Sequence, residues 1–160
     1  MLHLDFTDAE AAAGWTPVND VVMGGRSAST FLPSEGGAAF AGVVSFENGG
    51  GFASARTAAR RWPTDGALGF TLVVRGDGQR YRFTLRGDDE AIQYQAGFVA
   101  PADWSTVELA LADFVPRHRG RTLNDAPPLR AADIRTLGFL IADRQAGPFR
   151  LEIASIATRV

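Results

Sequence analysis

Apolar and polar residues alternate along many short segments of the chain, which is the pattern of half-buried β-strands. The clearest examples are residues 68–75 and 80–86, where leucine, phenylalanine, valine and tyrosine alternate with arginine, threonine or glycine. Because successive strand residues point to opposite faces, each segment has one face for a core and one for solvent. The same reasoning predicts further strands at 38–46, 51–57, 92–98, 106–110, 136–142 and 149–156.

Turn-forming residues separate these segments. Gly76-Asp77-Gly78-Gln79 is predicted to join 68–75 and 80–86 as a hairpin, and Gly87-Asp88-Asp89 supplies the next turn. No helical segment is long enough to cover a sheet, so the pattern predicts an all-β jelly-roll β-sandwich of about eight or more antiparallel strands. The expected core consists of Phe6, Phe40, Phe70, Leu72, Phe83, Leu85, Phe139, Ile141, Leu151 and Ile153.

Length and composition narrow the class of protein. With 160 residues, of which 46% are hydrophobic and 21% charged, the chain is expected to form a single domain over residues 1–160. No apolar run approaches the roughly 20 residues of a transmembrane segment, and the acidic start does not resemble a signal peptide. Together with the absence of cysteine, this predicts a cytoplasmic location, or one peripheral to the inner face of the membrane.

Charge and chemistry exclude several functions. The net charge is −2 and no long basic run occurs, so nucleic acid is not an expected partner. Only His3 and His118 are available as histidine catalysts, and neither adjoins a nucleophile motif, so we predict no enzyme and no cofactor. No loop has the dense oxygen ligands of a calcium site, and metal binding is left open. The arginines around His118 form either an anion-attracting patch or a solvated loop.

Alternation also places a set of polar side chains on one face of the middle strands. The planar groups of arginine and glutamine bind carboxylates and sugar hydroxyls, so this face is either a platform for carbohydrate or acidic peptide, or an ordinary solvated sheet face. Aromatic help for sugar would come from Trp15, Trp62, Tyr81 or Tyr94, although alternation turns both tyrosines toward the apolar side. The predicted polar face consists of Thr71, Arg75, Arg80, Arg82, Thr84, Arg86, Gln93 and Gln95.

The most distinctive stretch is Trp-Thr-Pro-Val-Asn-Asp-Val-Val-Met-Gly-Gly-Arg-Ser at residues 15–27. One interpretation is structural, in which Asn19 and Asp20 bond nearby backbone N–H groups and shape a loop. The other is functional, in which Trp15, Asn19 and Asp20 line a surface for a ligand or partner.

This stretch resembles the hallmark of the complex I intermediate-associated protein family, a Trp followed by Asn-Asp, then Val-Met-Gly-Gly and Ser. Matching pieces follow in order: Phe-Ala-Gly-Val-Val-Ser-Phe-Glu-Asn-Gly-Gly-Gly-Phe-Ala-Ser at 40–54, Arg-Gly-Asp-Gly at 75–78 before Tyr81, Trp104 before an alternating strand, and 143–145 leading into Gly-Pro-Phe at 147–149. The resemblance spans nearly the whole chain. It departs at Arg144, where the family is expected to have lysine, in a sequence that contains no lysine.

The resemblance implies a galactose-binding-like jelly roll that acts as a non-catalytic chaperone in the assembly of respiratory NADH:ubiquinone oxidoreductase, here as a bare bacterial-type domain. Its expected partner is a protein, such as a subunit or intermediate of the respiratory complex, and the alternative is a carbohydrate-binding module that uses the concave sheet face. The candidate binding residues under these hypotheses are Trp15, Asn19, Asp20, Arg75, Asp77, Arg82, Gln93, Asp143 and Gln145.

Overall fold

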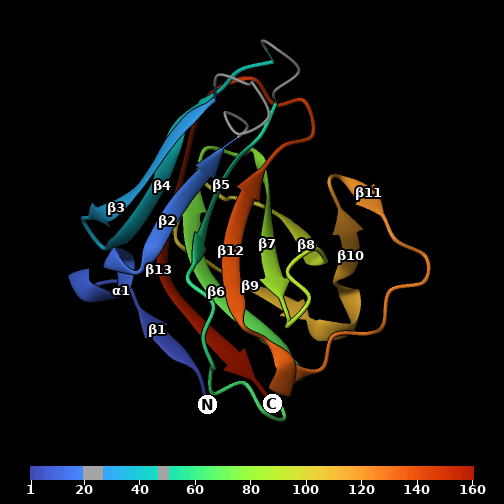
Figure 1. Cartoon of the computed structure of the whole chain (residues 1–160). Coiled ribbons are helices and arrows are strands. Elements are labelled where there is room, and N and C mark those ends of the chain that lie inside the picture. The colour runs from blue at the N-terminus through green and yellow to red at the C-terminus, as the bar shows by residue number, and fades with distance from the viewer. Residues whose placement is uncertain (20–26, 47–50) are drawn as a thin grey trace.

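A computed structural model shows the chain as a sandwich of two antiparallel sheets (Figure 1), and the structure describes residues 1–19, 27–46 and 51–160. One sheet contains β1 (His3–Asp5), β3 (Ala28–Ser34), β4 (Gly37–Val44), β6 (Gly69–Gly76), β9 (Ser105–Ala110) and β13 (Gly147–Arg159). The other contains β2 (Trp15–Asn19), β5 (Ala53–Thr57), β7 (Arg80–Arg86), β8 (Gln93–Val99), β10 (Val115–His118), β11 (Arg121–Thr122) and β12 (Thr136–Ile141). The predicted all-β sandwich is confirmed.

The order of strands follows from their antiparallel pairing. The six-stranded sheet runs β3-β4-β13-β6-β9, with β1 added beside the end of β13, and the seven-stranded sheet runs β11-β10-β8-β7-β12-β5-β2. The helical turns of the described residues are short: α1 (Ala9–Ala13), η3 (Leu111–Asp113) and η4 (Ala131–Asp133). None of these helices is long and apolar enough to cross a membrane.

The core lies between the two sheets and is rich in aromatic rings. All ten predicted core residues are at most 1% exposed, which confirms the alternation argument. The Phe83 ring on β7 lies 5.2 Å from that of Phe70 on β6 and 5.3 Å from that of Phe139 on β12, so aromatic contacts join the layers. Edge-to-face and offset rings of this kind stabilise beyond their buried area.

The predicted hairpin between 68–75 and 80–86 is wrong. β6 pairs with β13 and β9, whereas β7 pairs with β8 and β12, so the turn crosses from one sheet to the other. Alternation assigns faces to a strand, but it does not say which strand lies beside it. The turn residues are as expected, because Gly78 has φ +81°.

Five strands lie where no strand was predicted, and two of them build one side of the candidate site. Residues 116–129, for which no strand was predicted, contain the end of β10 and all of β11. Arg119 and Gly120 both have positive φ, at 49° and 79°, which is the geometry of a tight hairpin turn. In Figure 1 this hairpin stands at the side of the seven-stranded sheet, whose outer face turns toward the viewer.

Candidate functional site

The outer face of the seven-stranded sheet holds a groove of about 540 Å³. Its aliphatic lining consists of Val18, Ala55, Ala91, Leu140 and Ala142. Its basic lining consists of Arg56, Arg82, Arg86, Arg117 and Arg119, whereas Asp143 is the one acid among the described lining residues. The side chains come from β2, β5, β12, β7 and β8, and from the β10–β11 hairpin.

Strand alternation explains why these side chains reach the groove. On β7, Tyr81, Phe83 and Leu85 are fully buried toward the core, so the residues between them point outward. The register then aligns neighbours on the outer face: Thr84 lies opposite Gln95 on β8 and opposite Gly138 on β12.

Gly138 lies under the groove between two residues with longer side chains. It pairs with Arg56 on β5 and with Thr84 on β7. A Cβ at this position would lie 2.5 Å from Thr84 Oγ1 and 2.9 Å from the carbonyl oxygen of Ala55. The missing side chain therefore lets Thr84 and the backbone of β5 pack closely at this position, which a larger residue would prevent.

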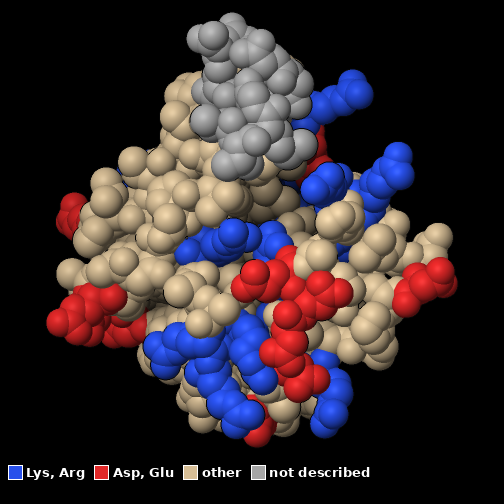
Figure 2. Space-filling model, in the orientation of Figure 1, with Lys and Arg blue, Asp and Glu red and all other residues tan. Residues whose placement is uncertain are grey.

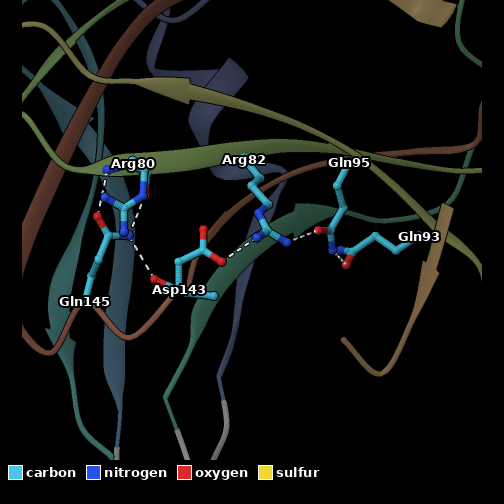
Figure 3. A network of polar contacts seen from close by, with 7 residues as sticks. Arg80, Arg82, Gln93, Gln95, Asp143 and Gln145 are labelled. Carbon is cyan, nitrogen blue, oxygen red and sulfur yellow. Dashed lines mark hydrogen bonds and ion pairs between the residues drawn. The ribbon is translucent and has the colours of Figure 1, made fainter. Parts of the chain in front are cut away.

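A chain of polar contacts crosses the face from the β12–β13 turn to β8 (Figure 3). The Arg82 guanidinium donates to Asp143 Oδ1 and, at 2.7 Å, to Gln95 Oε1. Gln95 Nε2 donates in turn to Gln93 Oε1 at 2.6 Å. The Arg82 and Asp143 side chains are 21% and 33% exposed, so the pair lies at the surface of the groove and not beneath it.

The β12–β13 turn is shaped to bring Asp143 back toward Arg82. Asp143 and Arg144 are consecutive left-handed residues, with φ of 63° and 60°, a conformation that aspartate tolerates better than most residues. Gln145 closes the turn: its Oε1 accepts from the Arg80 N–H, and its Nε2 donates to the carbonyls of Arg80 and Ala142, each at 2.8 Å. Gln145 thus positions Asp143 and uses its own amide within the fold.

The remaining arginines of the groove carry no ion pair among the described residues. Arg86 donates to the carbonyl oxygen of Glu90. Burial lowers the pKa of Arg86, and the nearby positive charge of Arg56 lowers it further. Arg117 lies opposite Gln93, and its buried Nε–H has no hydrogen-bond partner within the described ranges. The groove therefore contains positive charge that its own acids do not balance.

The structure places the residues of the 15–27 stretch differently from the functional interpretation. The expected surface role of Trp15 is wrong, because the ring is 5% exposed and stacks on Phe31 at 4.7 Å inside the core. Asn19 Oδ1 accepts from Ser29 Oγ at 2.7 Å and from the Ser54 N–H at 3.4 Å, a structural use of the amide. Asp20 lies outside the described residues.

Two further candidates lie away from the groove. Arg75 is on β6, on the outer face of the other sheet, and the same holds for Thr71, so the predicted single polar face of eight residues is wrong. Asp77 serves its own turn, where its carboxylate accepts from the Gln79 N–H at 3.1 Å, the Arg150 N–H at 2.8 Å and the Tyr81 hydroxyl. Arg82, Gln93 and Asp143 are the candidates that the fold brings together.

The aromatic rings proposed for sugar stacking are buried in the core. Trp62, Tyr81 and Tyr94 are 8% exposed or less, as Trp15 is, so none of the four proposed sugar-stacking rings is on the surface. The inward direction expected for both tyrosines is confirmed. Among the described lining residues, Phe52 and His118 carry rings, and His118 Nδ1 contacts the Ala91 carbonyl at 2.7 Å to hold the hairpin against the start of β8.

The contributors to the groove that the sequence analysis missed include Arg56, Arg117 and Leu140. Alternation in the predicted 51–57 strand places Arg56 outward, since Ala53 and Ala55 are apolar, so a signal was available. The sequence does not show which strands are neighbours. β12 lies between β5 and β7 in the sheet, although it comes far later in the chain.

Comparison with known proteins gives the chain a family. The sequence matches the family described as Complex I intermediate-associated protein 30 over residues 4–153. The mitochondrial Complex I intermediate-associated protein 30 of Mus musculus is 32% identical over 89 residues, which are 51% of this chain and 27% of the mouse protein. Its counterpart from Neurospora crassa is 24% identical over 94 residues, which are 56% of this chain and 34% of that protein. The chain thus matches about a third or less of these longer relatives.

Solved structures give the fold. A family 11 carbohydrate-binding module from Clostridium thermocellum, in complex with a β-1,3-1,4-mixed-linked tetrasaccharide, superposes with a TM-score of 0.64 at 12% identity, over 99% of this chain and 96% of that one. An agarase superposes with a TM-score of 0.63 at 10% identity, over 100% of this chain and 25% of the agarase. At such identities the likeness establishes a shared β-sandwich architecture and no ligand.

Proposed function

The chain belongs to the complex I intermediate-associated protein 30 family, and we propose that it is a non-catalytic binding domain that holds a protein partner during assembly of respiratory complex I. The observation that carries the proposal is the groove on the seven-stranded sheet with Arg82 and Asp143 at its surface. Asp143 was predicted from the family resemblance, and Arg82 was predicted from the polar face of the middle strands. Two independent arguments from sequence thus meet at one surface.

The lining of the groove supports binding as its role. It offers guanidinium and amide donors beside aliphatic side chains, a mixture typical of sites that recognise part of another molecule. A partner that belongs to a membrane complex would hold the domain at a membrane face while assembly proceeds. We therefore place its action peripheral to the membrane in which the complex is built.

Affinity purification of the tagged chain from its native host, after gentle membrane solubilisation, tests the proposal. Mass spectrometry is expected to identify subunits of NADH:ubiquinone oxidoreductase with the wild-type chain and to lose them with Arg82→Ala. Arg61→Ala, an exposed arginine outside the groove, is the matched control and should retain them. Recovery of no such subunits by the wild-type chain contradicts the assembly role.

Carbohydrate binding is a second candidate, favoured by the structural likeness to the family 11 module. The amides of Gln93 and Gln95 are suited to sugar hydroxyls, but Gln95 is buried and each amide already bonds within the polar chain of the face. The four predicted stacking rings are buried, so the rings left for a sugar among the described lining residues are those of Phe52 and His118. Titration with the β-1,3-1,4-mixed-linked tetrasaccharide separates the candidates, since saturable binding that Arg82→Ala abolishes supports carbohydrate.

A further inference from the structure

We propose that the groove selects an extended peptide segment that carries carboxylate and aliphatic side chains, with Arg56, Arg86 and Arg117 as receptors for the carboxylates. The inference rests on the proposed function, because it names the chemistry of the protein partner.

The groove carries a net positive charge, whereas the whole chain carries a net negative charge. Five arginines and one acid line the groove, and that acid is paired with Arg82, so four arginines have no acidic partner among the described lining residues. The whole chain has a net charge of −2. Figure 2 shows this face, with basic side chains over its middle and upper right, an acidic group directly beside and below the central ones, and further basic side chains on both sides of that acidic group. Concentrated positive charge inside a hollow attracts an anion from solution.

Three of these arginines are poised for an acceptor. Arg56 and Arg86 lie close enough for their like charges to repel, and Glu90 is the acid whose charge offsets part of this repulsion at Arg86. Arg117 has a buried Nε–H with no partner among the residues described. A carboxylate accepts two parallel N–H bonds from one guanidinium, so one carboxylate would relieve the repulsion between Arg56 and Arg86, and a second would satisfy the unpaired donor of Arg117.

The spacing of the arginines fits an extended chain. Arg117 is on β10, opposite Gln93 on β8. β8 lies between β10 and β7, and β7 carries Arg86. Neighbouring strands are about 4.8 Å apart, so two strand intervals separate these residues by about 10 Å, which an extended segment spans in about three residues. A single small anion such as phosphate fills one of these positions and leaves the other empty.

The rest of the lining favours peptide over acidic sugar. Val18, Leu140 and Ala142 give the groove apolar surface beside its charges, which suits aliphatic side chains that alternate with acids. An acidic sugar would need ring faces to stack on. Trp62, Tyr81 and Tyr94 are turned into the core, which leaves Phe52 and His118 as the rings among the described lining residues. Binding would bury aliphatic surface and form charge-assisted bonds together.

Selection from a random peptide library displayed on phage tests the inference on the full chain. Peptides retained by the wild-type protein are expected to be enriched in aspartate and glutamate interspersed with aliphatic residues. A synthetic copy of the most enriched peptide should bind about tenfold more weakly when its acids are replaced by amides, and about tenfold more weakly to Arg86→Gln, since each change removes a charge-assisted bond. Arg61→Gln, outside the groove, should bind as the wild type does.

Each other outcome overturns the inference. Retained peptides without an excess of acids, no retained peptide, or binding that Arg86→Gln leaves unchanged all contradict it. If oligogalacturonate or inorganic phosphate binds saturably at a site that acidic peptides do not occupy, the anion site belongs to that other ligand. The proposed function fails separately: if acidic peptides bind but native purification recovers no complex I subunit, the assembly role is wrong and the groove chemistry stands.

Discussion

The two outer faces of the sandwich both display arginines, but they differ in whether each arginine has an acidic partner. On the six-stranded sheet, Arg75 and Arg150 both reach the carboxylate of Glu152, at 2.5 Å and 3.4 Å, and Arg75 also lies over the Trp104 ring at 4.7 Å. On the seven-stranded sheet, Arg56 and Arg86 lie near each other over a groove and form no ion pair in the described ranges, although the charge of Glu90 also acts on Arg86.

The difference separates structural charge from charge available for binding. A guanidinium held by a carboxylate and a ring of its own sheet joins neighbouring strands, as Arg75 joins β6 to β13. A guanidinium without such a partner leaves donors for another molecule. The predictions that follow change one region at a time and begin with the largest expected effect.

Trp15→Ala is expected to have the largest effect, because the substitution empties core volume that supports both faces. Its ring stacks on Phe31 and Phe139, so the free energy of unfolding should fall by about 3–5 kcal/mol. Urea denaturation followed by circular dichroism measures the change. A stable variant that loses partner binding would instead place the tryptophan at the binding surface.

The double variant Arg56→Gln/Arg86→Gln should weaken binding and leave stability intact, the opposite of what is expected for Trp15→Ala. Affinity for an acidic peptide selected on the wild type is expected to fall about a hundredfold, as two charge-assisted bonds are lost. Stability should stay the same or rise, because the repulsion between the two guanidinium groups disappears. Isothermal titration calorimetry and urea denaturation measure the two quantities. Arg75→Gln, on the opposite face, is the control and should leave the affinity unchanged.

Gly138→Ala should distort the floor of the groove. Its new Cβ would press on Thr84 and on the backbone of β5, so we expect a loss of about 1–3 kcal/mol in the free energy of unfolding. Gly97→Ala is the matched control on the same sheet, since its Cβ would meet nothing closer than 3.8 Å. Equal stability of the two variants would contradict the close contact at Gly138.

The smallest effect is expected on the opposite face and depends on pH. Hydrogen bonding to Arg75, followed by the charges of Arg75 and Arg150, holds the pKa of Glu152 below its ordinary value of 4.5. A lowered carboxyl pKa stabilises the fold above the ordinary value, and that contribution is lost as the pH falls below it through the lowered pKa. The denaturation midpoint should therefore fall less steeply in acid for Glu152→Gln than for the wild type.

Arg86→Gln is the control for this pH dependence. Its steepness in acid should match that of the wild type, because Arg86 has no role in the Glu152 cluster. An identical acid dependence of the wild type and Glu152→Gln would show that the cluster contributes nothing to stability.

Much of the fold followed from alternation along single strands, while the site depended on which strands adjoin. The predicted core residues are buried because alternation within each strand's own sequence decides which side chains point to the core. The hairpin prediction failed because β6, which ends at Gly76, and β7, which begins at Arg80, belong to different sheets. Their partner strands β13 and β12 come from far along the chain. The same long-range pairing brings Arg56 beside Arg86, and no local pattern records it.

The central claim is that the groove of the seven-stranded sheet, and not the paired face opposite, is where the protein binds its partner. Two-dimensional NMR of the isotope-labelled chain, titrated with a selected acidic peptide, tests it most directly. The account predicts amide shifts concentrated in β5, β7, β8 and β10 around Arg56, Arg86 and Arg117, with β3, β4 and β6 unchanged. Shifts that cluster around Arg75 and Glu152 on the six-stranded sheet would contradict it.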